Sequence, residues 1–381
     1  MRPEYLYLHV PFCARRCTYC DFAVTALREP PVELWLDAII DEFGLVSNAE
    51  GWDRPLQLET LYIGGGTPSL LGPGAMTALR TRMRGIAEID EGTEWTVEAN
   101  PESFDDELAR DWQRAGVNRL SLGVQSFDEG VLRWMGRLHG PDGPGRAIRA
   151  ARRAGITNYS LDLIFGLPAR LERDWKGDIE RLLALEPKHI SLYGLTAEPA
   201  TPLGRWVEEG RERLADDERY REEFLYASER LQQEGFLHYE VSNFARPGHE
   251  SRHNQAYWSG EPYLGLGPSA HSFLPPLRRW NLRGWEAYRR TVAEGRSPVE
   301  DSELVGDEMA RLERLWLGLR VAEGIEAGPE GWTPGEERVA TRWVDEGWAI
   351  WEEDRLRLTP EGWLLLDELV IEFDRTSGVP T

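Results

Sequence analysis

The chain has very few cysteines, and it has no long apolar run. Only 3 of its 381 residues are cysteines, and all of them fall between positions 13 and 20. Three neighbouring thiols cannot form the disulfide framework of a secreted protein, and they suit a reducing compartment. No apolar run approaches the roughly 18 residues of a transmembrane helix. The N-terminal sequence MRPEYLYLHVPFC lacks the features of a signal peptide, so we expect a cytoplasmic protein.

Lysine is also scarce, and acidic residues outnumber basic ones. Lys176 and Lys188 are the only lysines, the 44 basic residues are otherwise arginine, and with 66 acidic residues the formal net charge is −22. Nonspecific nucleic-acid binding depends on basic side chains that neutralise phosphates, so this charge argues against it. We therefore expect small molecules or proteins as partners. With 41% hydrophobic and 29% charged residues, the composition is that of an ordinary globular protein.

The first 245 residues alternate short apolar runs with helical patterns. Predicted strands occupy residues 6–10, 58–66, 94–100, 118–126, 159–168 and 189–196. Predicted helices occupy residues 32–46, 73–86, 105–115, 128–135, 142–154, 172–185 and 216–235. Repeated βα units with buried strands predict a parallel sheet. Six units predict an α/β fold with a partial (β/α)6 barrel rather than a closed eight-fold one.

The pattern breaks after residue 245, and we expect three parts: a barrel over 1–245, a connecting region over 246–300 and a small domain over 301–381. Residues 246–285 are rich in glycine, proline, histidine, asparagine and aromatics, which predicts an ordered loop region. The last part has helical patterns, a short strand pair at 348–359 and a final helix beginning at 360. This order predicts a helical, winged-helix-like domain. Because it is rich in acidic residues, we expect it to pack or act as a lid rather than bind DNA.

Polar and glycine-rich signals stand where the predicted strands end. These signals are Gly64–Thr67, Glu98–Asn100, Gln125 and Asp162. Parallel α/β sheets place their active sites at the carboxyl ends of the strands. The sequence therefore predicts a functional site at this edge of the sheet.

The cysteines Cys13, Cys17 and Cys20 form a C-x3-C-x2-C pattern. Iron–sulfur clusters are held by cysteine thiolates, and a [4Fe–4S] cluster has four ligand positions. Three thiolates would leave one iron open for an outside ligand. A zinc site is the alternative, with His9 as the fourth ligand that structural zinc requires. Unrelated structural cysteines are a third interpretation, which the tight clustering disfavours.

This pattern at the end of the first strand of a βα barrel resembles the radical S-adenosylmethionine (SAM) superfamily. The resemblance implies a [4Fe–4S] cluster held by the three cysteines, with its open iron bound to the amino and carboxylate groups of SAM. Reductive cleavage of SAM in that superfamily gives a 5′-deoxyadenosyl radical. Tyr19, just before the third cysteine, resembles the aromatic that covers adenine. The stretch GGGTPS (64–69) resembles the glycine-rich strand end where the backbone approaches SAM without a Cβ clash.

Further motifs are similar to the coproporphyrinogen oxidase-like branch, which contains the oxidase HemN and the heme chaperone HemW. They are YLHVPFCARRCTYCDF, GGGTPS, VEANPES, RLSLGVQSF, LDLIFGLP, SLYGLTAEPATPL and LTPEGWLLLDELV. The resemblance implies SAM contacts at Tyr7, Tyr19, Gly65, Gly66, Thr67, Glu98, Gln125, Arg137 and Asp162. The carboxylates Glu98 and Asp162 can accept hydrogen bonds from the ribose or amino group, and Arg137 can pair with the SAM carboxylate. The resemblance assigns no catalytic residue.

Two features distinguish the chaperone type from the oxidase type. The oxidase has a further cysteine two positions after the third one, whereas this chain reads Cys20-Asp21-Phe22, as in the chaperone type. The stretch SRHNQAYWSG (251–260) also contains the H-N-x-x-Y-W motif that is associated with heme in the chaperone type. Its residues are His253, Asn254, Tyr257 and Trp258. An imidazole can ligate heme iron, and the aromatic rings offer flat apolar surface to a porphyrin.

The resemblance thus implies a heme chaperone with a [4Fe–4S] cluster, SAM and heme, which hands heme to acceptor hemoproteins, respiratory ones among them. We expect no nucleic-acid partner. We expect the protein to contact a membrane surface only through its acceptors, and the chain is compatible with forming a homodimer. One alternative is an oxygen-independent coproporphyrinogen III oxidase, which performs a SAM-dependent radical oxidative decarboxylation. A third is a zinc-bound structural or adaptor protein with a degenerate barrel.

Overall fold

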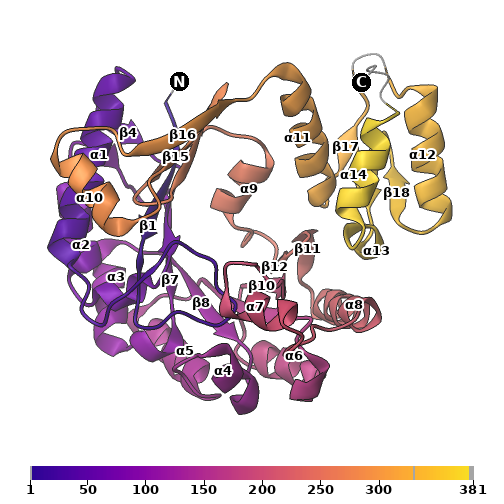
Figure 1. Ribbon diagram of the computed structural model, residues 1–381, viewed down its shortest axis with the longest axis horizontal. Helices are drawn as coiled ribbons and strands as arrows, with labels where there is room; N and C mark the ends of the chain where they lie inside the picture. The colour runs from indigo at the N-terminus through magenta and orange to yellow at the C-terminus, as the bar shows by residue number, and fades with distance from the viewer. Residues whose placement is uncertain (1, 329–330, 377–381) are drawn as a thin grey trace. The chain divides into compact units, whose positions relative to one another are not determined.

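The computed structural model describes residues 2–328 and 331–376 (Figure 1). The chain divides into two compact units. The first comprises Met1–Asp216 and Pro262–Leu304, and the second comprises Asp217–Glu261 and Val305–Thr381. The limits of these compact units differ from the predicted domain boundaries at residues 245 and 300. The division into three domains stays a prediction. Among the described residues, no helix combines the length and the apolar character needed to cross a membrane.

Six parallel strands form the centre of the first unit, which confirms the predicted α/β fold with six βα units. In sheet order they are β10 (His189–Gly194), β9 (Tyr159–Phe165), β8 (Arg119–Gln125), β7 (Glu94–Ala99), β5 (Thr60–Gly65) and β1 (Tyr5–Val10). Their apolar side chains are almost completely buried, as expected for strands covered on both faces. Two short pairs, β2 (Phe12–Cys13) with β3 (Thr25–Ala26) and β4 (Leu56–Gln57) with β6 (Ala87–Glu88), lie outside this sheet.

Six helices of this unit follow the strands as the sequence predicts. They are α1 (Val32–Ala49), α2 (Ala75–Arg82), α3 (Asp106–Ala115), α4 (Glu129–Met135), α5 (Gly143–Ala154) and α6 (Trp175–Leu183). The short helix α7 (Pro202–Glu208) was not predicted. Figure 1 shows α1, α2, α3 and α5 along the outer side of the strands. Helix α3 illustrates why the bounds are predictable. The Asp105 carboxylate caps its first turn, accepting from the N–H of Glu107 and Leu108, and Gly116 ends it at a φ of 101°.

The predicted loop region over residues 246–285 is wrong. It contains α9 (Arg252–Trp258), β13 (Tyr263–Leu266), β14 (His271–Leu274) and β15 (Leu277–Asn281), followed by α10 (Trp285–Ala293) and β16 (Val299–Leu304). Strand β13 pairs in parallel with β1, and the sheet then continues through β14, β15 and β16. Strands of four or five residues between glycines and prolines give little periodic signal. The partner that joins β13 to the parallel sheet, β1, also lies more than 250 residues away in the sequence.

The second unit contains α8 (Asp217–Gln233), the hairpin of β11 (Leu237–Glu240) and β12 (Asn243–Ala245), and α9. It continues with α11 (Asp307–Arg320), α12 (Pro334–Asp345) and a three-stranded sheet in the order β17 (Ile325–Glu326), β19 (Arg355–Leu358), β18 (Ala349–Glu352). The predicted strand pair at 348–359 is confirmed. The predicted final helix is instead two helices, α13 (Pro360–Trp363) and α14 (Leu366–Asp374). The winged-helix likeness of this part stays a prediction.

Candidate functional site

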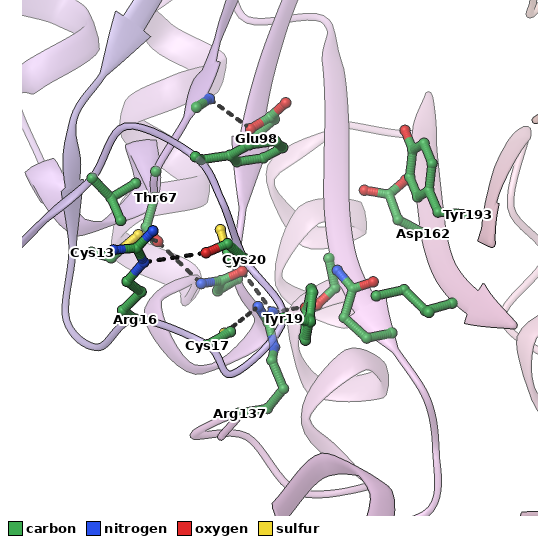
Figure 2. A pocket seen from close by; sticks show the side chains of 18 of the residues that line it. Cys13, Arg16, Cys17, Tyr19, Cys20, Thr67, Glu98, Arg137, Asp162 and Tyr193 are labelled. Carbon is green, nitrogen blue, oxygen red and sulfur yellow. Dashed lines mark hydrogen bonds between the residues drawn. The ribbon is translucent and has the colours of Figure 1, made fainter. Parts of the chain in front are cut away.

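A cavity of about 550 Å³ opens at the carboxyl ends of the parallel strands (Figure 2). Its lining comes from the cysteine loop and from the ends of β5, β7, β8, β9 and β10. It includes most of the residues that the sequence predicts, namely Cys13, Cys17, Tyr19, Cys20, Gly65, Gly66, Thr67, Glu98, Gln125, Arg137 and Asp162. The first unit therefore brings eleven residues from six separate segments to one site. Of the predicted set, Tyr7 is not part of this lining; its ring lies against Tyr62, and its hydroxyl is 3.1 Å from His9 Nδ1.

The cysteine loop is held in place by main-chain contacts with two other segments. The Thr18 N–H donates to the Met135 carbonyl at 3.1 Å, and the Thr18 carbonyl accepts from Leu203 N–H at 2.9 Å. All three thiols are free. Burial raises the pKa of the Cys13 thiol to about 11, so a bound metal would have to stabilise the thiolate that ligation requires.

Three sulfur donors along one cavity fit an iron–sulfur cluster better than any harder metal. Within the described parts of the chain, no three histidine, cysteine or acidic side chains already surround one metal-sized point. The zinc alternative is not supported, because both ring nitrogens of His9 are engaged. They lie 3.1 Å from the Tyr7 hydroxyl and 3.1 Å from the Ala23 carbonyl. Burial lowers the pKa of His9 to about 4, so the ring is neutral, and it is the engagement of both nitrogens that argues against ligation.

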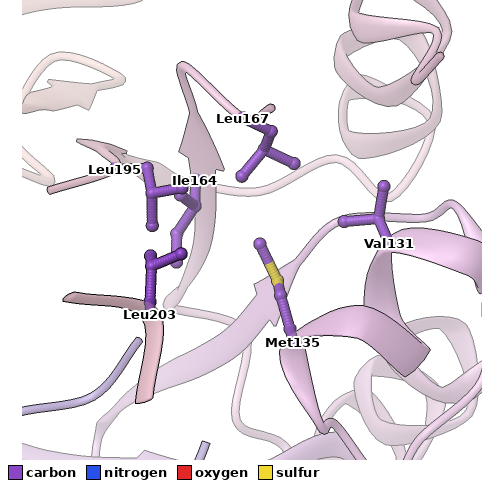
Figure 3. Packing of buried hydrophobic residues seen from close by; sticks show 6 residues of the cluster. All are labelled: Val131, Met135, Ile164, Leu167, Leu195 and Leu203. Atoms are coloured by element: carbon purple, nitrogen blue, oxygen red, sulfur yellow. The ribbon is translucent and has the colours of Figure 1, made fainter. Parts of the chain in front are cut away.

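A small apolar core lies behind the cysteine loop (Figure 3). It consists of Val131, Met135, Ile164, Leu167, Leu195 and Leu203, with Tyr19 packed against it. Met135 and Leu203 are also the residues whose backbone anchors Thr18. The same segments therefore provide both the packing and the hydrogen bonds that shape the loop between the second and third cysteines.

Replacing Leu203 by alanine should destabilise the protein and loosen this loop. Leu203 has no exposed surface, and burying such a side chain is worth about 2–5 kcal/mol in a leucine-to-alanine change. Alanine keeps the Leu203 N–H, so only packing is removed. Thermal unfolding of L203A should begin well below that of the wild type. The control is L34A at a half-exposed position, where we expect little change; equal unfolding temperatures for L203A and the wild type would contradict this prediction.

The glycine-rich end of β5 lies directly against the first strand and the cysteine loop. The Gly66 N–H donates to the Val10 carbonyl, and the Thr67 N–H donates to the Phe12 carbonyl, each at 2.8 Å. A Cβ on Gly66 would stand 2.5 Å from the Phe12 oxygen. Only glycine fits at this position, because a Cβ would overlap the backbone of the first strand and of the cysteine loop.

Two partly buried carboxylates face the same cavity. Glu98 accepts hydrogen bonds from the Gly65 N–H at 3.0 Å and from the Tyr62 hydroxyl at 2.9 Å. Asp162 accepts from the Ser121 hydroxyl at 3.0 Å. Burial raises the pKa of Glu98 to about 7 and that of Asp162 to about 6. A cationic ligand would offset this desolvation, and SAM carries both a sulfonium and an ammonium group.

Gln125 and Arg137 have buried polar atoms without a hydrogen-bond partner. They are Gln125 Oε1 and Arg137 Nε. Gln125 also has a φ of 67°, at an irregularity in the pairing of β8 with β9 that sets the direction of its side chain. Buried polar groups are normally satisfied, so such atoms are consistent with a bound polar ligand.

Sequence reasoning did not assign a role to Asn100, which also lines the cavity. Its side chain accepts from Arg137 Nη2 at 2.7 Å and donates to the Thr67 hydroxyl at 3.2 Å. The available signal was its position at the end of a predicted strand, in the same stretch as Glu98. Its partners could not be identified, because they come from two other segments of the chain.

The H-N-x-x-Y-W motif lies on α9 in the second unit. Ser251 caps this helix by accepting from the Asn254 N–H. His253 is only 1% exposed, and its Nε2 lies 2.9 Å from the Tyr257 hydroxyl. Burial lowers the pKa of His253 to about 3, so the ring is neutral. The guanidinium of Arg320 lies over the Trp258 ring, 4.2 Å from its centre. Heme contact by these residues stays a prediction.

Comparisons with known proteins agree with this arrangement. Residues 7–182 match the model of the radical SAM superfamily. The heme chaperone HemW of Mycobacterium tuberculosis is 36% identical over 97% of this chain and 94% of its own length. The heme chaperone HemW of Bacillus subtilis is 35% identical, over 84% of each chain. The solved structure of the coproporphyrinogen III oxidase HemN from Escherichia coli matches 98% of this chain and 90% of that one, with a TM-score of 0.79. Its identity of 21% shows a shared fold alone.

Proposed function

The chain belongs to the heme chaperone HemW family of the radical SAM superfamily, and from this membership we propose that it binds heme and transfers it to acceptor hemoproteins. The observation that carries the proposal is the similarity to HemW proteins over almost the whole chain. Respiratory acceptors, a cytoplasmic location and a homodimer stay predictions within it.

In this proposal the cavity of the first unit holds a [4Fe–4S] cluster and SAM. Cys13, Cys17 and Cys20 would ligate the cluster. The Gly66 carbonyl would be offered to the amino group of SAM, since the N–H groups of Gly66 and Thr67 already donate to Val10 and Phe12. Glu98, Gln125 and Asp162 would offer oxygens to its polar hydrogens. When bound, the cluster would supply the one-electron reducing chemistry by which the superfamily cleaves a C–S bond of SAM. The chain itself contributes the pocket, hydrogen-bond donors and acceptors in fixed positions, and glycine backbone at Gly65 and Gly66 that carries no side chain.

The charge of the cavity does not distinguish the chaperone from the oxidase. Its lining holds four acids, Asp21, Glu98, Asp162 and Glu198, and three arginines, Arg15, Arg16 and Arg137. The chaperone is favoured instead by the identity to HemW over almost the whole chain and by the Cys20-Asp21-Phe22 sequence. Arginines line the cavity beside the cysteines, where Arg137 already donates to Asn100 and Gly123. The structural similarity to HemN shows a shared fold and does not indicate which substrate this chain binds.

The experiment that tests this proposal pairs two assays on the anaerobically reconstituted protein. We expect hemin to produce a Soret band with a saturable titration curve. We expect no conversion of coproporphyrinogen III to protoporphyrinogen IX in the presence of SAM and a reductant. Efficient conversion would overturn the chaperone assignment in favour of the oxidase.

His253→Ala should weaken hemin binding and shift the Soret band. The neutral imidazole of His253 is a suitable iron ligand, and the substitution also removes the partner of the Tyr257 hydroxyl. His249→Ala is the matched control, because it removes an imidazole from the same unit outside the motif. An identical titration for H253A and the wild type would exclude His253 as the ligand.

A further inference from the structure

Two of the three cysteine sulfurs face a hydrogen-bond donor from outside the cysteine loop. The Thr67 hydroxyl donates to Cys13 Sγ at 3.3 Å. Arg137 Nη1 points to Cys17 Sγ at 3.9 Å. Thr67 follows β5, and Arg137 follows α4, as Figure 2 shows beside the three cysteines. Each donor therefore reaches its sulfur from a different wall of the cavity.

Asn100 connects these two donors. Its Oδ1 accepts from Arg137 Nη2 at 2.7 Å, and its Nδ2 donates to the Thr67 hydroxyl at 3.2 Å. A guanidinium can only donate, so the orientation of the amide follows from the network. The backbone of Asn100 is fixed as well, because its N–H donates to the Ser69 hydroxyl at 3.2 Å. One side chain at the end of β7 thus sets the position of both donors.

Arg137 is a partly buried cation that donates to two neutral oxygens and a sulfur. Besides Asn100, it donates to the Gly123 carbonyl at 2.6 Å. Its guanidinium also interacts electrostatically with the Glu102 carboxylate. A charge removed from water is costly unless an opposite charge compensates it. The cysteine thiolates, to which Arg137 already points, would add to the compensation that Glu102 provides.

We propose that Asn100 is a positioning residue for the cluster, because it holds Thr67 on the Cys13 sulfur and Arg137 on the Cys17 sulfur, and that these two donors raise the reduction potential of the cluster. The inference rests on the cluster of the proposed function. Reduction adds one electron, supplied by an external reductant, and makes the sulfurs more negative. Hydrogen bonds and a nearby cation stabilise that reduced form more than the oxidised one.

The test is a redox titration of SAM-free, anaerobically reconstituted protein, followed by electron paramagnetic resonance of the reduced cluster. Asn100→Ala should shift the midpoint potential to a more negative value than that of the wild type, at equal iron and sulfide content. Thr67→Val and Arg137→Gln should each shift it in the same direction. Arg137→Lys keeps the positive charge, so its midpoint potential should lie between those of R137Q and the wild type.

The matched control is Arg133→Gln. Arg133 is an exposed arginine of α4, the helix that precedes Arg137, and it does not line the cavity, so R133Q removes the same formal charge where water screens it. We expect its potential to stay close to that of the wild type. A shift in R133Q as large as that in R137Q would overturn the specific role of the network, and so would an unchanged potential in N100A.

If N100A fails to assemble a cluster, T67V decides the question. This substitution keeps the shape of the side chain and removes only the hydroxyl that donates to Cys13. An unchanged potential in T67V would then overturn the inference. Absence of iron and sulfide from the wild type is a different result: it contradicts the proposed function itself, whereas a loaded wild type with no shift in the variants contradicts this inference alone.

Discussion

Cys17→Ala should leave the purified protein without an iron–sulfur cluster. A reconstituted wild type should hold about four iron and four sulfide per chain, with three cysteine ligands and one open iron. The chain has only 3 cysteines, so no spare thiol can replace the lost one. Iron and acid-labile sulfide should fall close to zero, and the broad visible absorbance should disappear. Cys13→Ala and Cys20→Ala should behave in the same way.

The loss can be separated from misfolding. Cys17 is only partly buried, and the loop is anchored next to it by the backbone of Thr18, which the substitution leaves intact. Far-ultraviolet circular dichroism should therefore match that of the wild type. Arg15→Ala, on the same loop, should keep the cluster. Full iron and sulfide in C17A, or zinc without sulfide in the wild type, would contradict the assignment of the three cysteines.

The parallel strands of the first unit were predictable because each is an apolar run that ends at a polar or glycine residue. The sequence predicts a strand over residues 94–100, and β7 spans Glu94–Ala99. Both faces of such a strand are buried, so its composition alone reveals it. The strands after residue 260 lack this signal. The parallel pairing of β13 with β1 depends on residues far away in the sequence, which no local pattern can reveal.

The lining of the site was predictable from family motifs, but its internal contacts were not. Glu98 and Asp162 follow from motif alignment, and both line the cavity. The alignment does not show that Arg137 donates to Asn100. It also could not show that His9 is engaged through both ring nitrogens, which argues against the zinc alternative. Such contacts depend on side-chain positions in three dimensions.

The raised pKa values of Glu98 and Asp162 bear on the kind of ligand that suits the cavity. Burial raises the pKa of both carboxyls, and an anionic ligand would raise it further. A cationic ligand such as SAM has the opposite effect. The two acids are thus consistent with the SAM site of the proposed function, and heme contact by the motif on α9 stays a prediction.

Gly66→Ala should weaken SAM binding by roughly 10- to 100-fold. The added Cβ would stand 2.5 Å from the Phe12 oxygen and 2.8 Å from the Val10 oxygen, and both are backbone atoms that cannot rotate away. The unliganded protein can relieve this overlap by moving the end of β5 away from β1. Binding requires the strand end to return, so an overpacking strain of about 1–3 kcal/mol falls on the bound state. Since 1.4 kcal/mol corresponds to about a tenfold change in affinity, this range gives the expected loss.

Equilibrium dialysis of SAM against the reconstituted protein measures this change without requiring any turnover. Gly140→Ala is the matched control, because a Cβ built there meets no heavy atom within 4 Å, and its SAM affinity should equal that of the wild type. Iron and sulfide content must be measured in parallel, since Phe12 directly precedes Cys13 and a shifted strand end can also disturb the first cluster ligand. A G66A protein that holds its cluster and still binds SAM as tightly as the wild type would show that the glycine-rich end of β5 is not where the backbone meets SAM.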